Sequence, residues 1–96
     1  MAQFTLQVRT HDNLLDLLAR GESGDWVVGQ GREQEITDVQ IVNWDGSQMI
    51  QATLNRDSSY RLETDPRRLV LRFSDAQIVN CQVEFDAPRS VVRYLP

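Results

Sequence analysis

Polar and apolar residues alternate at the start of the chain. Over residues 3–9, the side chains of Phe4, Leu6 and Val8 fall on one side of an extended chain, which is the pattern of a half-buried β-strand. The period then changes, because four leucines lie between Asn13 and Gly21. Residues 10–13, Thr-His-Asp-Asn, offer several N-cap candidates, and Gly21 is placed where a C-cap is expected, so this spacing predicts one short helix near the N-terminus. So short a helix is unstable alone, and its leucines are expected to pack on the sheet.

The dipeptide Asp45-Gly46 is the strongest local signal. It separates two β-prone segments and favours a two-residue hairpin turn, in which both central residues must tolerate positive φ. Pairing the segments around this turn gives an apolar face with the pairs Ile41–Ile50, Val39–Ala52 and Thr37–Leu54. The other face is mixed and has the pairs Trp44–Ser47, Val42–Met49, Gln40–Gln51 and Asp38–Thr53.

The remaining β-prone segments are short and closely spaced. They cover residues 26–28, 59–64, 69–74, 78–85 and 90–95, with turn residues between them, among which are 22–25. We therefore expect a mainly β fold, an antiparallel meander of seven to eight strands that forms a small barrel or a two-layer sandwich. A parallel βαβ arrangement is not expected, because the crossover helices that it needs are missing.

Length and composition fit one domain over residues 1–96. Two separate cores would each be too small, and 41% hydrophobic residues with 25% charged residues exclude a disordered chain. No apolar run reaches the roughly 20 residues of a membrane helix, and no cationic signal-peptide start is present. The expected compartment is the cytoplasm, in agreement with the single cysteine, Cys81.

The charge balance weighs against nucleic acid as a partner. The net charge is −4, whereas affinity for nucleic acid comes largely from basic residues that neutralise phosphates. All ten basic residues are arginine. The chain alone therefore cannot use a mechanism that needs a catalytic lysine.

Residues 38–43, Asp-Val-Gln-Ile-Val-Asn, return as residues 75–80, Asp-Ala-Gln-Ile-Val-Asn. The similarity fits either a duplicated β unit or convergence of two apolar strands. The two segments disagree about which side is apolar. The repeat makes Ile78 equivalent to Ile41, whereas the alternation after Val79 puts Val79, Cys81 and Val83 on the side opposite Ile78. A β-bulge near Ile78 would resolve this conflict.

Residues suited to catalysis are few. His11, beside Asp12 and Asp16, could act as a general base, and Cys81 is the one thiol. We favour a plainer interpretation, an exposed histidine before the helix and a cysteine buried as a small hydrophobe. The loop at residues 29–31, Gly-Gln-Gly, resembles a phosphate loop, but a strand is expected to follow it instead of a helix. No catalytic residue, metal site or cofactor is therefore predicted.

Two surface features could serve binding. The first is a basic patch, the one place where basic residues gather in the sequence. Its candidate binding residues are Arg61, Arg67, Arg68 and Arg72. Pairing with Glu63, Asp65 and Asp75 is the plainer interpretation of them. The second feature is an apolar patch on the mixed face of the hairpin, made of Trp44, Val42 and Met49. If exposed, it marks an interface, and if covered by the helix, it is a second core layer.

No motif justifies naming a family. The sequence favours a non-catalytic binding or assembly module that acts through its sheet surface, on a protein partner or on itself. One alternative is a small-ligand-binding protein or hydrolase with a carboxylate- or arginine-lined pocket at a barrel mouth. Another is an acidic inhibitor or immunity-type protein, whose complex would weaken with salt.

Overall fold

A computed structural model describes residues 3–85 and 92–95. The elements within these ranges are seven strands, one α-helix and one turn of 3-10 helix: β1 (Phe4–Thr10), α1 (Leu14–Arg20), β2 (Glu22–Val27), η1 (Arg32–Glu35), β3 (Ile36–Asn43), β4 (Gln48–Leu54), β5 (Tyr60–Arg61), β6 (Arg68–Asn80) and β7 (Val92–Leu95).

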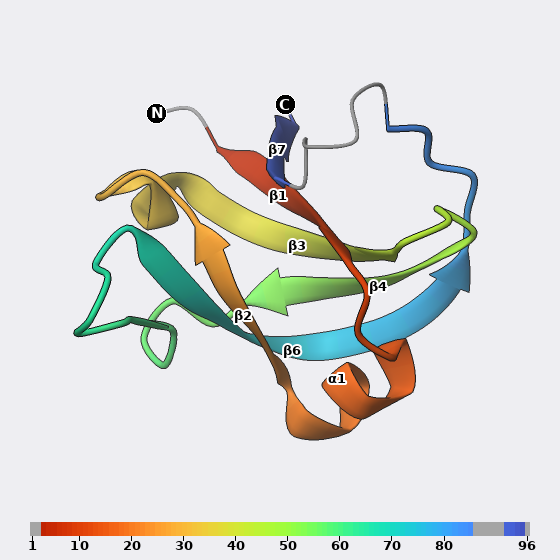
Figure 1. The fold of residues 1–96 in the computed structure, drawn as a ribbon, viewed down its shortest axis with the longest axis horizontal. Coiled ribbons are helices and arrows are strands. Elements are labelled where there is room, and N and C mark those ends of the chain that lie inside the picture. Colours follow the sequence, from red (N-terminus) through yellow and green to blue (C-terminus); the bar gives the residue numbers. More distant parts are fainter. Residues whose placement is uncertain (1–2, 86–91, 96) are drawn as a thin grey trace.

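The strands form one curled sheet in the order β2-β6-β4-β3-β1-β7, and β5 pairs with the first part of β6. Figure 1 shows the sheet bending into an open half-barrel, with α1 at one end of the curl. The expected mainly β fold with one short helix is confirmed, and most strand pairs are antiparallel. The sheet stays open between β2 and β7.

One strand pair is parallel, whereas the predicted meander has antiparallel pairs alone. β1 runs parallel to β3, with Val8 beside Ile41, and antiparallel to β7. The connection from β1 to β3 contains α1, β2 and η1, of which β2 joins the far end of the sheet. A parallel pair needs a long connection, and this excursion supplies it without a helix dedicated to the crossover.

Helix α1 is capped at both ends, by Gly21 as predicted and by Asn13, one of the several N-cap candidates. The Asn13 side chain accepts hydrogen bonds from the N–H groups of Leu15 and Asp16, and Gly21 ends the helix at φ 68°. Leu14 and Leu17 are buried in the core. Leu15 is 67% exposed, however, so not all of the leucines pack on the sheet. At 3.6 residues per turn, Leu15 lies outside the stripe that faces the core.

The register predicted for the β3–β4 hairpin is confirmed at the pairs from Asp38–Thr53 to Val42–Met49. The turn itself differs from the prediction. Gly46 donates a backbone hydrogen bond to Asn43 across 3.1 Å and has φ 79°, whereas Asp45 does not have positive φ. The connection is therefore the four residues 44–47, in which Gly46 alone uses the left-handed region.

Several predicted boundaries are wrong. Residues 22–25, expected as a turn, open β2, and the expected strands 69–74 and 78–85 are one continuous strand, β6, which ends at Asn80. The expected strand 59–64 shortens to Tyr60–Arg61, and η1 separates the glycine loop from β3. Of the expected strand 90–95, the structure describes only β7, and residues 90 and 91 lie outside the described ranges.

The core fills the inside of the curl. Apolar side chains from one face of each long strand meet those of α1 there. Fully buried members are Leu6, Val8, Leu17, Ile36, Val39, Ile41, Ile50 and Leu71. The opposite face of β1, β3, β4 and β6 points away from this core and is called the outer face below.

Candidate functional site

The two repeated segments lie on the two strands that flank β4. β3 and β6 are both antiparallel to β4, so they run parallel to each other. The register places Gln40 and Gln77 on either side of Gln51, and Ile41 and Ile78 on either side of Ile50. These identical residues of the repeat therefore occupy corresponding positions, the isoleucines on the core side and the glutamines on the outer face. Asp38 and Asp75 do not correspond in this way, because Asp38 is level with Ser74.

A β-bulge in β6 makes this correspondence possible. Gln51 pairs with Gln77 and Thr53 with Ser74, so two residues of β6, Asp75 and Ala76, stand opposite the single residue Ala52. Asp75 has φ 54° and is the one described non-glycine residue with positive φ. The bulge shifts the alternation, which brings Ile78 to the core side and Asp75 to the outer face. The bulge inferred from the sequence is present, three residues before Ile78.

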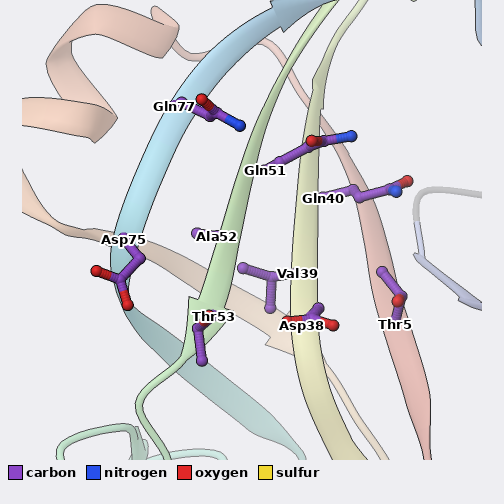
Figure 2. A pocket seen from close by; sticks show the side chains of 9 residues that line it. All are labelled: Thr5, Asp38, Val39, Gln40, Gln51, Ala52, Thr53, Asp75 and Gln77. Atoms are coloured by element: carbon purple, nitrogen blue, oxygen red, sulfur yellow. The ribbon is translucent and has the colours of Figure 1, made fainter.

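The outer face is hollowed where the repeats meet β4 (Figure 2). This outer hollow has a volume of about 330 Å³. Its rim is polar, with side chains from four strands, and its floor is Val39 and Ala52. The polar lining residues are Thr5, Asp38, Gln40, Gln51, Thr53, Asp75 and Gln77.

Hydrogen-bonding capacity at the outer hollow is largely unused. Within the described chain, the side chains of Asp38, Asp75, Gln51, Gln77 and Thr53 make no hydrogen bond or ion pair. The exposed fraction of all five is high. A row of amides and carboxylates directed to solvent can therefore exchange water for a ligand's polar groups without first breaking internal contacts.

Gln40 has one fixed partner, which sets the orientation of its amide. Gln7 on β1 donates from Nε2 to Oε1 of Gln40 across 2.9 Å. The Nε2 group of Gln40 is thus left to donate at the rim of the outer hollow. Gln7 is only 5% exposed, and its own Oε1 accepts no hydrogen bond from the described residues.

The predicted apolar patch lies on the same face, in the row next to the glutamines. Val42 and Met49 pair across β3 and β4 and are buried, and Trp44 is half-buried. The guanidinium carbon of Arg9 lies 4.0 Å from the ring centroid of Trp44 and 4.4 Å from that of Phe85. The cover at this end therefore involves Arg9 and Phe85, and α1 packs on the core side instead.

The predicted basic patch is engaged in contacts within the chain. Arg61 donates to the carbonyl groups of Val28 and Gly29 and to the carboxylate of Glu33, at 2.6, 3.0 and 2.6 Å. Its side chain is 21% exposed. Arg61 thereby closes the loop between β2 and β3 onto β5, a structural task that occupies the guanidinium.

The other three arginines of this patch have acidic neighbours. Arg67 and Arg68 both lie near Asp65, with N···O distances of 3.0 and 3.5 Å, and Arg72 lies 3.8 Å from Glu22. Pairing with Asp65 is as the sequence suggested, whereas Glu63 and Asp75, the other expected partners, form no ion pair within the described residues. The Glu22 and Glu33 pairs were missed because they join segments far apart in the chain.

The two residues considered for catalysis are occupied in other ways. His11 stacks on Trp44, with ring centroids 3.6 Å apart. The Cys81 thiol donates to the carbonyl of Gly46 across 3.3 Å. Burial raises the pKa of the Cys81 thiol, and the nearby Asp45 charge adds to this rise, so the reactive thiolate is disfavoured.

The sequence predicted the pairing of some residues that line the outer hollow, but it did not predict the outer hollow as a site. The hairpin register placed Gln40 beside Gln51 and Asp38 beside Thr53, which is confirmed. Asp75 and Gln77 were missed as members of the same surface. The sequence held a signal for them, because Asp-x-Gln occurs in both copies of the repeat. A β-bulge before Ile78 was needed to place the second copy on the same face of the sheet as the first.

Comparisons with models of protein families, with curated proteins and with solved structures each gave no match to this chain. Among the described residues, no group of three or more His, Cys, Asp or Glu side chains is arranged to hold a metal ion. No helix in the described ranges is long and apolar enough to cross a membrane.

Proposed function

We propose that this protein is a non-catalytic binding module whose outer hollow docks a segment of a partner protein that carries basic side chains. The observation behind the proposal is the unused polar lining of the outer hollow, with two carboxylates among neutral amides. The cytoplasm is the proposed compartment, since a single half-buried cysteine suits a reducing environment.

The shape of the outer hollow favours a protein segment over a small molecule. Small-ligand sites are usually deep and mostly apolar, whereas this depression is shallow and its rim is polar. A hydrolase built on Asp38 and Asp75 is the less favoured alternative. Both carboxylates are exposed, and nothing in the described chain encloses a substrate over them.

Charge supports a basic partner. Asp38 and Asp75 are the charged side chains in the lining, and neither has a cation within salt-bridge distance in the described chain. The net charge of −4 adds a favourable long-range field. Complementary charge of this kind raises the association rate and selects partners. Binding through an acidic surface was also the basis of the inhibitor hypothesis, which this proposal makes more specific.

The test compares affinity capture by three forms of the protein. The wild type, the double variant Asp38→Asn/Asp75→Asn and the control Asp57→Asn/Glu63→Gln are immobilised and exposed to extract of the source cells. The control removes the same charge from exposed turn residues away from the outer hollow. Captured proteins are quantified by mass spectrometry, and each candidate is purified and its dissociation constant measured with all three forms.

The proposal expects a basic protein that binds the wild type and the control equally and the outer-hollow variant more weakly. Raising the salt concentration should weaken the same complex. Capture that is indifferent to Asp38 and Asp75 would reject the outer hollow as the docking site. Recovery of a second copy of this chain, lost in the same variant, would replace the partner with self-association.

A further inference from the structure

We infer that the outer hollow recognises a polyproline-II segment with two basic side chains three residues apart. This inference rests on the proposed function and specifies its partner. It follows from the way the repeat displays the same pair of polar residues twice.

The repeat presents a carboxylate and an amide on each of two strands, with the two amides at translated positions. Asp38 and Gln40 lie on β3, and Asp75 and Gln77 lie on β6, with β4 between the two strands (Figure 2). Because β3 and β6 run parallel and both pair with β4 at Gln51, Gln77 is related to Gln40 by a shift across the sheet. Two strand spacings make this shift about 9.5 Å. Asp75 belongs to the bulge, and the register partner of Asp38 across β4 is Ser74.

A ligand that uses both pairs should repeat with the same period. In an extended β-strand, side chains on one side recur every two residues, at about 6.7 Å. In a polyproline-II helix they recur every three residues, at about 9.3 Å. The second spacing matches that of Gln40 and Gln77, so a polyproline-II chain that crosses β3, β4 and β6 brings residues i and i+3 over these two glutamines, each of which has a carboxylate two residues before it, Asp38 and Asp75.

The chemistry of the lining suits such a chain. A polyproline-II segment makes no internal hydrogen bonds, so its carbonyl and N–H groups need partners. The amides of Gln51 and Gln77 have no partner in the described chain, and Gln40 keeps its Nε2 donors. Each exposed carboxylate can accept two hydrogen bonds from one guanidinium. Amides for the backbone and carboxylates for the side chains together specify an Arg-x-x-Arg segment.

The experiment is an NMR titration of the isotopically labelled protein with three capped peptides. The first is Gly-Arg-Pro-Pro-Arg-Gly, and the second, Gly-Arg-Pro-Arg-Pro-Gly, has the same composition with the arginines two residues apart. The third, Gly-Glu-Pro-Pro-Glu-Gly, reverses the charge. Each is also titrated into Asp38→Asn/Asp75→Asn and into Asp57→Asn/Glu63→Gln, whose spectra report whether the fold is retained.

We expect saturable shifts at the backbone amides of Gln51, Thr53 and Gln77 with the first peptide. Its affinity should exceed that of the second peptide and should fall about three- to tenfold in the outer-hollow variant, the effect of two exposed ion pairs. The control variant should bind as the wild type does.

Other outcomes separate the two proposals. Equal affinity for the first and second peptides would overturn the spacing, and equal affinity for the third would overturn the charge. Absence of saturable shifts with every peptide would overturn the inference as a whole. The proposed function would then stand only if the purified partner still loses affinity for Asp38→Asn/Asp75→Asn, and it would fall with the inference if the partner does not.

Discussion

Arg61 and Glu33 form an ion pair in which Nη2 of Arg61 lies 2.6 Å from Oε2 of Glu33. The pair joins β5 to η1, across 28 residues of sequence. Because Arg61 also donates to the carbonyl of Val28, one guanidinium fixes the path of the chain from the end of β2 to the start of β3. The stability of this region should therefore depend on a single side chain.

Replacing Arg61 by Met should lower the free energy of unfolding by about 2–4 kcal/mol, because several carbonyl groups and a carboxylate lose a charged donor. Arg67→Met is the matched control. The Arg67 side chain is 77% exposed and its ion pair with Asp65 is at the surface, so its loss should leave the free energy of unfolding close to that of the wild type. Urea unfolding measures both, and equal values would contradict the structural role of Arg61.

Stability should also fall in acid through Glu33. Burial raises the pKa of Glu33, but hydrogen bonds from its own N–H, from Arg61 and from Gly31, with the Arg61 charge, outweigh burial and hold the pKa below its ordinary 4.5. A lowered pKa stabilises the fold fully above pH 4.5, and this stabilisation is lost as the pH falls through the folded-state pKa. Unfolding measured across this range should show a smaller acid dependence for Glu33→Gln than for the wild type. Identical slopes would show that the Glu33 pKa is the same in the folded and unfolded chain.

The turn after β3 offers a test of a close backbone contact. A Cβ added at Gly46 would lie 2.1 Å from the Val83 carbonyl oxygen, whereas one added at Gly31 meets nothing within 4 Å. Both glycines have positive φ, so Gly31→Ala reports the backbone strain alone, about 1–3 kcal/mol. Gly46→Ala should be more destabilising and should speed hydrogen exchange at the Val83 N–H, which now donates to Gly46 across 3.0 Å. Equal destabilisation would mean that the segment after β6 moves away without cost.

Leu17 and Leu15 test how α1 packs. Leu17 is fully buried, and Leu17→Ala should cost about 2–5 kcal/mol through lost contacts and a cavity. Leu15→Ala removes the same atoms from an exposed position and should change stability by about 0.5 kcal/mol or less. Thermal or urea unfolding of both variants checks this difference. A large loss at Leu15 would indicate that its side chain is covered in solution.

The sequence predicted those elements whose causes are local. An N-cap within residues 10–13, the Gly21 C-cap and the β3–β4 register depend on neighbouring residues, and the structure has them as expected. The parallel pairing of β1 with β3 depends on contacts between segments far apart in sequence, which no local pattern specifies. The continuity of β6 was hidden because its bulge interrupts the alternation that marks a strand.

The candidate site was accessible only in part for the same reason. Gln40 and Gln51 follow from one hairpin, whereas the place of Gln77 beside them requires that β6 pairs with β4. The contacts of the Arg61 and Arg9 side chains could not be predicted from the sequence pattern either, since each arginine contacts a residue more than 25 positions away. Side-chain partners of this kind are fixed by tertiary structure.

The place of β1 in the sheet has a consequence for how the chain folds. Thr5 pairs with Leu95 on one side, and Thr10 with Asn43 on the other. Local hairpins such as β3–β4 can form early, but the first strand has no neighbour in sequence to pair with, and closing long loops slows folding. During synthesis on a ribosome, β1 can join β3 once residue 43 has emerged, and its second edge waits for β7. Of the described strands, β1 is thus made first, and its second edge is paired only by the last of them, β7.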